Sequence, residues 1–366
     1  MEFSKLVRGE PGQYIAAQGS LKELPERLRL FRQPVVITGK KSYAAFVKHF
    51  GRECDWPVLF YDGTASYEDM ERLAAQAKEL GADVLVGIGG GKVMDTTKGT
   101  ADRIGVEVVL VPTLAATCAC STPLLVAYYP DHSFKSVDYC QRSGFMTLVD
   151  YNLLIEAPKQ YLISGISDTL AKWYELEAIH RGKNPAELPA LIQLALATAS
   201  VSKNILLEDT EAALLAADQK KVTPAFKRMV DTIYAVAANV GCQTSDYVSG
   251  AHAIHNGLTV LPETHSIVHG IKVAYGILVQ LCVTGNEEEV LQLFPYYKKN
   301  NFLYSWDQLN ITENKQTAQL KVARHAASQE ETFILLNPSL TPDDILVAIN
   351  RLDELAADFD RGEVYG

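Results

Sequence analysis

Short apolar segments alternate with segments of helical spacing from about residue 11 to residue 155. The apolar segments occupy residues 33–39, 56–61, 84–86, 106–111 and 145–150, and the helical ones residues 42–50, 66–80 and 92–104. Mostly apolar strands separated by helices are typical of a parallel sheet with helices on both faces. Residues 125–129 and 133–139 are predicted to form a hairpin. We therefore expect an α/β domain over residues 1–155.

Beyond residue 155 the pattern changes to helical spacing with few strand signals. The predicted helices cover residues 162–180, 188–206, 209–217, 224–242, 251–259, 269–284, 287–299, 315–328 and 342–358. We therefore expect a second, all-α domain over residues 156–366.

Composition narrows the class of protein. The 366 residues are 48% hydrophobic and 21% charged, which is ordinary for a globular protein of about two domains. A net charge of −10 argues against nucleic-acid binding. No unbroken run of eighteen apolar residues occurs and the N-terminus lacks an apolar signal core, so we expect no membrane span. Six dispersed cysteines without a CxxC pair favour reduced thiols and a cytoplasmic location.

The stretch from Val84 to Asp95 carries the first chemical signal. An apolar run is followed by four glycines in five residues and then by a helical pattern that starts near Lys92. Such a turn directs backbone N–H groups and the positive end of a helix toward an anion. The sequence is neither a P-loop, which would need glycine at Val86, nor a Rossmann fingerprint, which would need glycine at Lys92. A tight turn without a ligand is the alternative.

Other small residues follow the predicted strands in the same way. Gly39, the glycines from Gly87 to Gly91, and Pro112-Thr113 all fall at the predicted carboxyl ends of strands. Because ligands of parallel sheets bind at the carboxyl ends of the strands, we expect these residues to converge.

A cluster of histidines is the second signal. Four of the eight histidines fall within eighteen residues, namely His252, His255, His265 and His269. Imidazole and carboxylate groups are the ligands of catalytic zinc and iron(II), and Asp168 is a candidate carboxylate. The spacing leaves two alternatives open, since the histidines can be ordinary surface or core residues and Asp168 can be a helix cap.

Four motifs in order resemble the glycerol dehydrogenase-like branch of the metal-dependent, or iron-containing, alcohol dehydrogenases. They are GIGGGKVMDTTK (87–98), PTLAATCACS (112–121), GISDTLAKWYE (165–175) and AHAIHNGLTVLPETHSIVHGIKVAYG (251–276). The resemblance spans nearly the whole chain and is strongest to the hydroxycarboxylate dehydrogenases. It implies the dehydroquinate synthase-like fold, with a dinucleotide-binding domain before a helical metal-binding domain, and a homo-oligomer.

The resemblance also implies roles for individual residues. Asp168, His252 and His269 would bind the metal, and His255 would act with them near the nicotinamide. Lys172 stands where other superfamily members carry a fourth histidine, which favours zinc over iron, and it would face the substrate together with Cys118. The residues implied to bind the cofactor are Gly39, Lys40, Gly89, Gly90, Gly91, Lys92, Asp95, Thr113, Thr117, Thr122, Leu124 and Tyr128.

Two departures from the family pattern bear on specificity. Cys118 replaces the aspartate with which glycerol dehydrogenases contact the polyol; without that carboxylate an anionic 2-oxo acid is favoured. Gly39, followed by Lys40 and Lys41, replaces the aspartate that accepts the ribose 2′-OH of NAD, which favours NADP(H). The alternatives are that Cys118 is an inert buried residue and that the two lysines form a solvated turn.

The sequence thus predicts a metal-dependent oxidoreductase that transfers hydride between NAD(P)(H) and a small alcohol or carbonyl compound. The preferred reaction is reduction of a 2-oxo acid to a 2-hydroxy acid. Glycerol dehydrogenase is the first alternative, and a dehydroquinate synthase-like or polyol phosphate enzyme is the second. A cofactor-binding protein without catalysis is a third, which the presence of all three candidate metal ligands disfavours.

Overall fold

A computed structural model describes residues 9–244 and 248–362. By its internal contacts the chain forms two compact units, Met1–Leu162 with Ala212–Gln243, and Ile163–Glu211 with Thr244–Gly366. The predicted division at residue 155 placed residues 212–243 with the helical part, whereas here they pack with the first unit.

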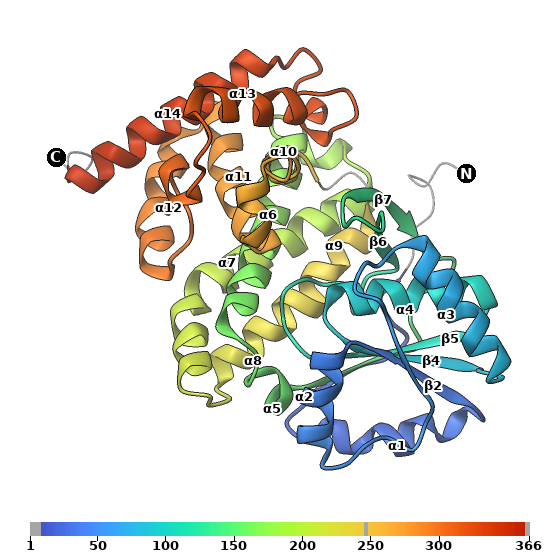
Figure 1. Ribbon diagram of the computed structural model, residues 1–366. Helices are drawn as coiled ribbons and strands as arrows, with labels where there is room; N and C mark the ends of the chain where they lie inside the picture. Colours follow the sequence, from blue (N-terminus) through green and yellow to red (C-terminus); the bar gives the residue numbers. More distant parts are fainter. Residues whose placement is uncertain (1–8, 245–247, 363–366) are drawn as a thin grey trace. The chain divides into compact units, whose positions relative to one another are not determined.

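A six-stranded sheet forms the centre of the first unit (Figure 1). All neighbouring strands are parallel, and their order is β1-β8-β5-β4-β2-β3. The strands are β1 (Tyr14–Ala17), β2 (Pro34–Thr38), β3 (Val58–Phe60), β4 (Val84–Gly89), β5 (Glu107–Pro112) and β8 (Met146–Asp150). The predicted parallel sheet is confirmed. The pattern missed β1, whose four residues are too few to give a periodic signal.

Helices cover both faces of this sheet, as the burial of every residue in β2, β4 and β8 requires. Figure 1 shows α1 (Leu24–Arg27) and α2 (Lys40–Phe50) against one face, and α3 (Tyr67–Glu79) and α4 (Gly91–Ile104) against the other. Ser66 caps α3 by accepting a hydrogen bond from the backbone N–H of Asp69. The short helix α5 (Tyr151–Leu154) follows β8.

The predicted hairpin is also present. β6 (Leu124–Tyr128) and β7 (Phe134–Tyr139) pair antiparallel and form a separate two-stranded sheet.

Tyrosine hydroxyls link residues 224–243 to other parts of the first unit. They form α8 (Pro224–Asp231), a π-helical turn (Thr232–Val236) and α9 (Ala237–Gln243), where the pattern predicts one continuous helix. The carboxylate of Asp231 accepts hydrogen bonds of 2.8 Å from the hydroxyls of Tyr14 and Tyr151. The hydroxyl of Tyr234 donates to the backbone carbonyl of Leu114. These bonds explain why the segment belongs to the first unit.

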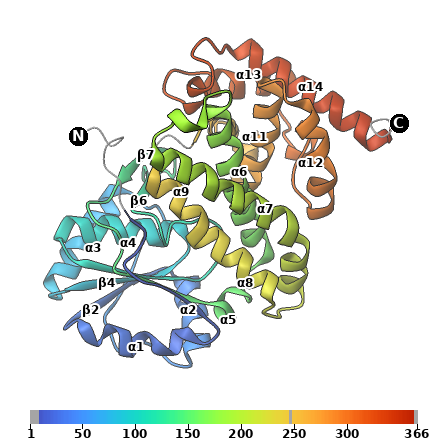
Figure 2. The same ribbon diagram turned by 180° about the vertical axis from the view of Figure 1, so that it is seen from behind.

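The described residues of the second unit form helices joined by loops, with no strand among them (Figure 2). Its main helices are α6 (Lys159–His180), α7 (Ala190–Asp218), α10 (Gly250–Leu258), α11 (His269–Val283), α12 (Glu287–Asn300), α13 (Lys315–Ala326) and α14 (Pro342–Arg361), of which α6 and α7 extend into the first unit. α10 packs against α11 and α13, and α11 also packs against α14. The predicted fold class, α/β followed by a helical region, is confirmed.

One helix differs from the pattern. The prediction of separate helices over residues 188–206 and 209–217 is wrong, because residues 207–208 contain no helix breaker and α7 runs through them. By length and composition α7 is also apolar enough to cross a membrane, which a search for unbroken apolar runs overlooked. Core helices of soluble proteins reach the same length and apolar composition, so these two properties alone do not assign α7 to a membrane. The absence of membrane and nucleic-acid partners and the homo-oligomer stay predictions.

Candidate dinucleotide and metal sites

The glycine motif lies where β4 meets α4. β4 ends at Gly89, Gly90 is the N-cap residue with an extended backbone, and α4 begins at Gly91. A Cβ atom at Gly89 would lie 2.6 Å from the side chain of Val93, so a glycine is required there. No side chain caps this helix, and its first turn carries no acidic residue. Its N-terminal N–H groups therefore suit an anion such as the diphosphate of a dinucleotide.

Other predicted cofactor residues lie at the same edge of the sheet. The N–H of Thr113 donates to the carbonyl of Gly89, and Thr117 Oγ1 lies 3.2 Å from the position that a Cβ of Gly91 would take. The ammonium of Lys92 lies 4.4 Å from the ring centroid of Tyr128. Burial lowers the pKa of Lys92 and raises that of Tyr128 to about 12, with help from Asp95 at Tyr128. The structure thus brings these residues together, while their roles stay predictions.

Gly39 begins α2 as its N-cap residue, beside the glycine motif. β2 pairs with β4, so that Thr38 lies opposite Ile88. A Cβ atom at Gly39 would lie 2.9 Å from Cε1 of Tyr61. The ring of Tyr61 therefore fills the space in which an aspartate side chain would begin. Lys40, the first residue of α2, is exposed.

Lys98 fixes the loop that follows β5 to α4. Its ammonium lies 2.9 Å from Asp95 Oδ1 and donates to the backbone carbonyls of Ala119, Thr122 and Leu124. The Lys98 side chain is only 4% exposed. This loop carries Cys118, which is buried. The sequence pattern did not identify Lys98, which lies one helical turn after Asp95 and holds much of the predicted cofactor surface in place.

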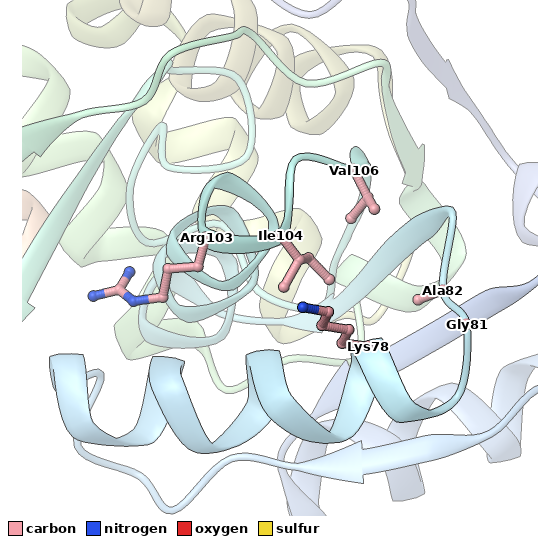
Figure 3. A pocket seen from close by; sticks show the side chains of 6 residues that line it. All are labelled: Lys78, Gly81, Ala82, Arg103, Ile104 and Val106. Atoms are coloured by element: carbon pink, nitrogen blue, oxygen red, sulfur yellow. The ribbon is translucent and has the colours of Figure 1, made fainter.

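A pocket lies at the other edge of the same sheet (Figure 3). Its lining comes from the ends of α3 and α4 and from the residues just before β4 and β5, namely Lys78, Gly81, Ala82, Arg103, Ile104 and Val106. These residues lie at the amino ends of the strands, so the pocket is separate from the edge with the glycine motif.

In the second unit, three predicted metal ligands converge. Asp168 lies in α6, His252 in α10, and His269 is the first residue of α11. One ligand atom of each lies within 4.8 Å of the others. Asp168 Oδ1 is 3.3 Å from His252 Nε2 and 3.2 Å from His269 Nε2. A carboxylate and two imidazoles are a common ligand set of catalytic zinc and of non-haem iron, so the residues fit either metal.

The electrostatics of this cluster show how strongly its groups interact. Burial disfavours the charged form of Asp168, but the hydrogen bonds from both imidazoles outweigh burial and hold the pKa of this carboxyl well below its usual range. Burial lowers the pKa of His252, but attraction to Glu175 and the contact with Asp168 outweigh it and raise the pKa to about 10. The protein thus places negative charge where a cation would replace the proton.

Glu175 contacts His252 on the side of the imidazole that faces away from Asp168. The sequence patterns did not identify this residue. It lies two helical turns after Asp168 and its side chain has no exposed surface. Its carboxylate is 2.7 Å from His252 Nδ1 and accepts from the backbone N–H groups of His252 and Ser249. Because a carboxylate only accepts, Nδ1 of His252 carries a proton, and Nε2 is the nitrogen that faces Asp168 and can offer a lone pair to a cation that takes the place of its proton. The spacing of seven residues between the two acids was the available signal.

The remaining predicted residues lie near this cluster or apart from it. His255 Nε2 is 2.9 Å from Nδ1 of His269, so His255 contacts a candidate ligand without being one of the three. Burial, together with His269 and Lys272, holds the pKa of His255 well below its usual range. Lys172 lies buried one helical turn after Asp168. His265 is exposed and contacts the backbone carbonyl of Thr259, so the structure gives it no place in the site.

Comparison with known proteins identifies the family. The model of the iron-containing alcohol dehydrogenases matches residues 11–147. The chain is similar to hydroxycarboxylate dehydrogenase A of Escherichia coli K12, with 36% identity over 95% of this chain and 97% of the relative. The chain belongs to the iron-containing alcohol dehydrogenase family. It is therefore an oxidoreductase of the alcohol dehydrogenase type.

Glycerol dehydrogenases are similar over almost the same length. That of Thermotoga maritima shares 32% identity over 94% of this chain and 95% of the relative. The crystal structure of a probable glycerol dehydrogenase from Sinorhizobium meliloti 1021 superposes with a TM-score of 0.86 at 26% identity, covering 96% of this chain and 98% of that chain. Membership of the iron-containing alcohol dehydrogenases thus confirms the resemblance predicted from the motifs. The segment matched by the family model ends before Asp168, so the metal cluster is an independent observation.

Proposed function

We propose that this chain is an NADP(H)-dependent, zinc-dependent reductase that converts a 2-oxo acid to a 2-hydroxy acid. The observation that carries the proposal is the convergence of Asp168, His252 and His269. A divalent cation held there supplies Lewis-acid polarisation of a carbonyl oxygen. The overall reaction is 2-oxo acid plus NADPH plus a proton giving 2-hydroxy acid plus NADP+. The fourth histidine of other superfamily members is replaced by Lys172, which supports zinc over iron.

The protein's own residues supply binding and orientation. The first N–H groups of α4 are suited to bind the diphosphate, and Lys92 adds a positive charge beside Tyr128. Asp168 and Glu175 hold the two sides of His252 and so fix the direction of its ring. Lys272 lies one turn after His269, is 5% exposed, and has its pKa lowered by burial to about 8. A buried ammonium favours an anionic substrate in the second unit.

Cys118 and Gly39 support the two finer parts of the proposal. A buried thiol at residue 118 offers no carboxylate to bind the hydroxyls of glycerol or to repel a substrate carboxylate. At residue 39 the ring of Tyr61 stands against a glycine, and two exposed lysines follow. The similarity to a protein named hydroxycarboxylate dehydrogenase agrees with this substrate class.

Glycerol oxidation is the second candidate, because several relatives are named glycerol dehydrogenases. The test is an absorbance assay of the zinc-loaded protein with NADPH or NADH, and with 2-oxobutanoate, 2-oxoglutarate or dihydroxyacetone. We expect oxidation of NADPH with an oxo acid and little reaction with dihydroxyacetone. Preference for dihydroxyacetone and NADH would contradict both finer parts of the proposal and favour the second candidate.

A variant separates the role of residue 118 from that of the metal. We expect Cys118→Asp to lower kcat/KM for the oxo acid and to raise it for dihydroxyacetone, because the new carboxylate repels an anion and accepts bonds from hydroxyls. Cys54→Ser, in the same unit and half-buried, is the matched control and leaves both values unchanged. Equal loss on both substrates in Cys118→Asp would argue against a substrate-selecting role.

A further inference from the structure

A line of hydrogen bonds extends from His269 away from the metal cluster, through His255, to two groups with no assigned role. His269 Nδ1 lies 2.9 Å from His255 Nε2, and His255 Nδ1 lies 2.9 Å from Asn256 Oδ1. The amide nitrogen of Asn256 donates to both carboxylate oxygens of Glu331, at 3.2 and 3.0 Å. We propose that Glu331 and Asn256 are positioning residues that set the direction of this chain and so present the Nε2 lone pair of His269 to the metal. The inference rests on the metal-binding part of the proposed function.

The direction of the chain follows from its carboxylate end. A carboxylate of Glu331 can only accept, so the NH2 group of Asn256 faces Glu331 and the amide oxygen faces His255. That oxygen can also only accept, so Nδ1 of His255 carries the proton. The Nε2 atom of a neutral His255 is then an acceptor, and Nδ1 of His269 is its donor. Because Nδ1 of His269 is the donor to His255, Nε2 is the nitrogen that faces Asp168 Oδ1, 3.2 Å away, and it can offer a lone pair to a cation that takes the place of its proton.

Each imidazole of the cluster is therefore connected to a carboxylate by hydrogen bonds, but through different numbers of residues. His252 contacts the carboxylate of Glu175 directly. His269 is connected to the carboxylate of Glu331 through His255 and Asn256. A carboxylate behind a ligating imidazole fixes its tautomer and its orientation.

His269 has the greater need of such support. Its side chain is 39% exposed, whereas that of His252 is 18% exposed, so packing restrains the His269 ring less. Glu331 is itself held in place: its side chain is 12% exposed, and Oε1 lies 3.0 Å from Nε2 of His325. A well-held carboxylate at the far end can therefore keep a less buried imidazole aligned.

The test measures zinc affinity by competition with a chromophoric chelator, without cofactor or substrate. Glu331→Leu leaves the Asn256 amide free to turn, and Asn256→Leu removes it; each is expected to weaken zinc binding by about 10- to 100-fold. Glu331→Gln can still accept from Asn256, so it is expected to retain most of the affinity. Glu313→Gln, which breaks an exposed ion pair with Lys321 on the same unit, is the matched control and should bind zinc normally.

A second measurement needs no variant. Nitrogen-15 NMR of the imidazoles in the zinc-loaded protein should show His255 and His269 both protonated at Nδ1. His255 protonated at Nε2, or wild-type zinc affinity in both leucine variants, would overturn the inference. His269→Ala distinguishes failure of this inference from failure of the proposed function. If His269→Ala also binds zinc with wild-type affinity, then zinc does not bind at Asp168, His252 and His269. If only His269→Ala loses zinc, the site stands and the positioning role of Glu331 does not.

Discussion

The Nδ1 atom of His252 lies 2.7 Å from Oε2 of Glu175, a carboxylate with no exposed side-chain surface. The same carboxylate accepts from the N–H groups of Ser249 and His252 at the start of α10. It therefore links the position of a candidate ligand to the backbone that carries it.

Replacement of Glu175 by leucine should damage both functions of this carboxylate. We expect zinc affinity to fall by about 10- to 100-fold, because the tautomer of His252 is no longer fixed. We expect each backbone N–H left without a partner to cost about 1–3 kcal/mol in the free energy of unfolding. Chelator competition and denaturant unfolding measure the two effects. Glu177→Gln, on the same helix but in an ion pair with the partly exposed Arg181, should change neither; normal zinc affinity in Glu175→Leu would contradict the supporting role.

Removal of the metal should destabilise the protein. A cation that binds the folded chain at 100 times its dissociation constant stabilises it by about 2.7 kcal/mol. Treatment with EDTA should therefore lower the thermal midpoint, and added zinc should restore it. The double variant His252→Ala/His269→Ala should show no response to either treatment. A wild-type midpoint that is indifferent to EDTA and zinc would show that the cluster does not hold a metal.

The stability of the metal-free protein should depend on pH in a defined direction. The folded pKa of His252 is raised to about 10, so its contribution is fully present below about 6.5 and is lost as the pH rises through 10. The folded pKa of Asp168 is lowered, so its contribution is present above about 4 and is lost on acidification. Zinc requires His252 without its Nε2 proton, so the gain in midpoint on adding zinc should increase between pH 6 and 9. A gain that decreases with pH would contradict this account.

Much of the fold followed from the order of apolar and polar residues. Strands β2, β4, β5 and β8 are short apolar runs because both faces of the sheet are covered, and each was located to within a few residues of its ends. β1 was missed because its four residues owe their conformation to pairing with β8, a neighbour more than a hundred residues away. The break predicted inside α7 was wrong because a change in polarity does not end a helix without a breaking residue.

Only the site residues that lie in recognisable motifs could be predicted from the sequence. Asp168, His252 and His269 lie in recognisable segments, and the structure brings them together. Glu175, Lys98 and Glu331 were not identified, since each acts through a hydrogen bond to a residue distant in sequence or to a backbone carbonyl. The spacing of seven residues from Asp168 places Glu175 on the same helix face but does not reveal its partner. Such partners depend on how the helices pack, which neither propensity nor spacing encodes.

Replacement of Lys98 by methionine should loosen the loop before β6. The variant keeps the length of the side chain but leaves Asp95 buried without its cation and three carbonyls without their donor. Breaking a buried ion pair in this way costs about 3–5 kcal/mol of unfolding free energy. We also expect KM for the dinucleotide to rise more than kcat falls, because the loop carries predicted cofactor residues. Lys48→Met, which removes a 70% exposed partner of Glu156, is the control and should change neither quantity.

Gly39 offers the sharpest test of cofactor preference, provided that Tyr61 is changed with it. Aspartate at residue 39 would place its Cβ 2.9 Å from the Tyr61 ring, so Gly39→Asp alone should both destabilise the protein and perturb the site. In Gly39→Asp/Tyr61→Ser the carboxylate has room. It should repel a 2′-phosphate and accept from a 2′-hydroxyl, which shifts the ratio of kcat/KM for NADPH over NADH toward NADH by about 10- to 100-fold, or roughly 1.4–2.8 kcal/mol.

Two single variants complete that experiment. Tyr61→Ser alone should leave the cofactor ratio near that of the wild type, since it adds no charge. Lys40→Gln should weaken NADPH binding while NADH is little affected, because an exposed ammonium contributes only to the charged 2′-phosphate. If the double variant keeps the wild-type ratio, the ribose does not reach residue 39. If the wild type already prefers NADH, the lysines after Gly39 are a solvated turn, and the glycine serves only to accommodate the ring of Tyr61.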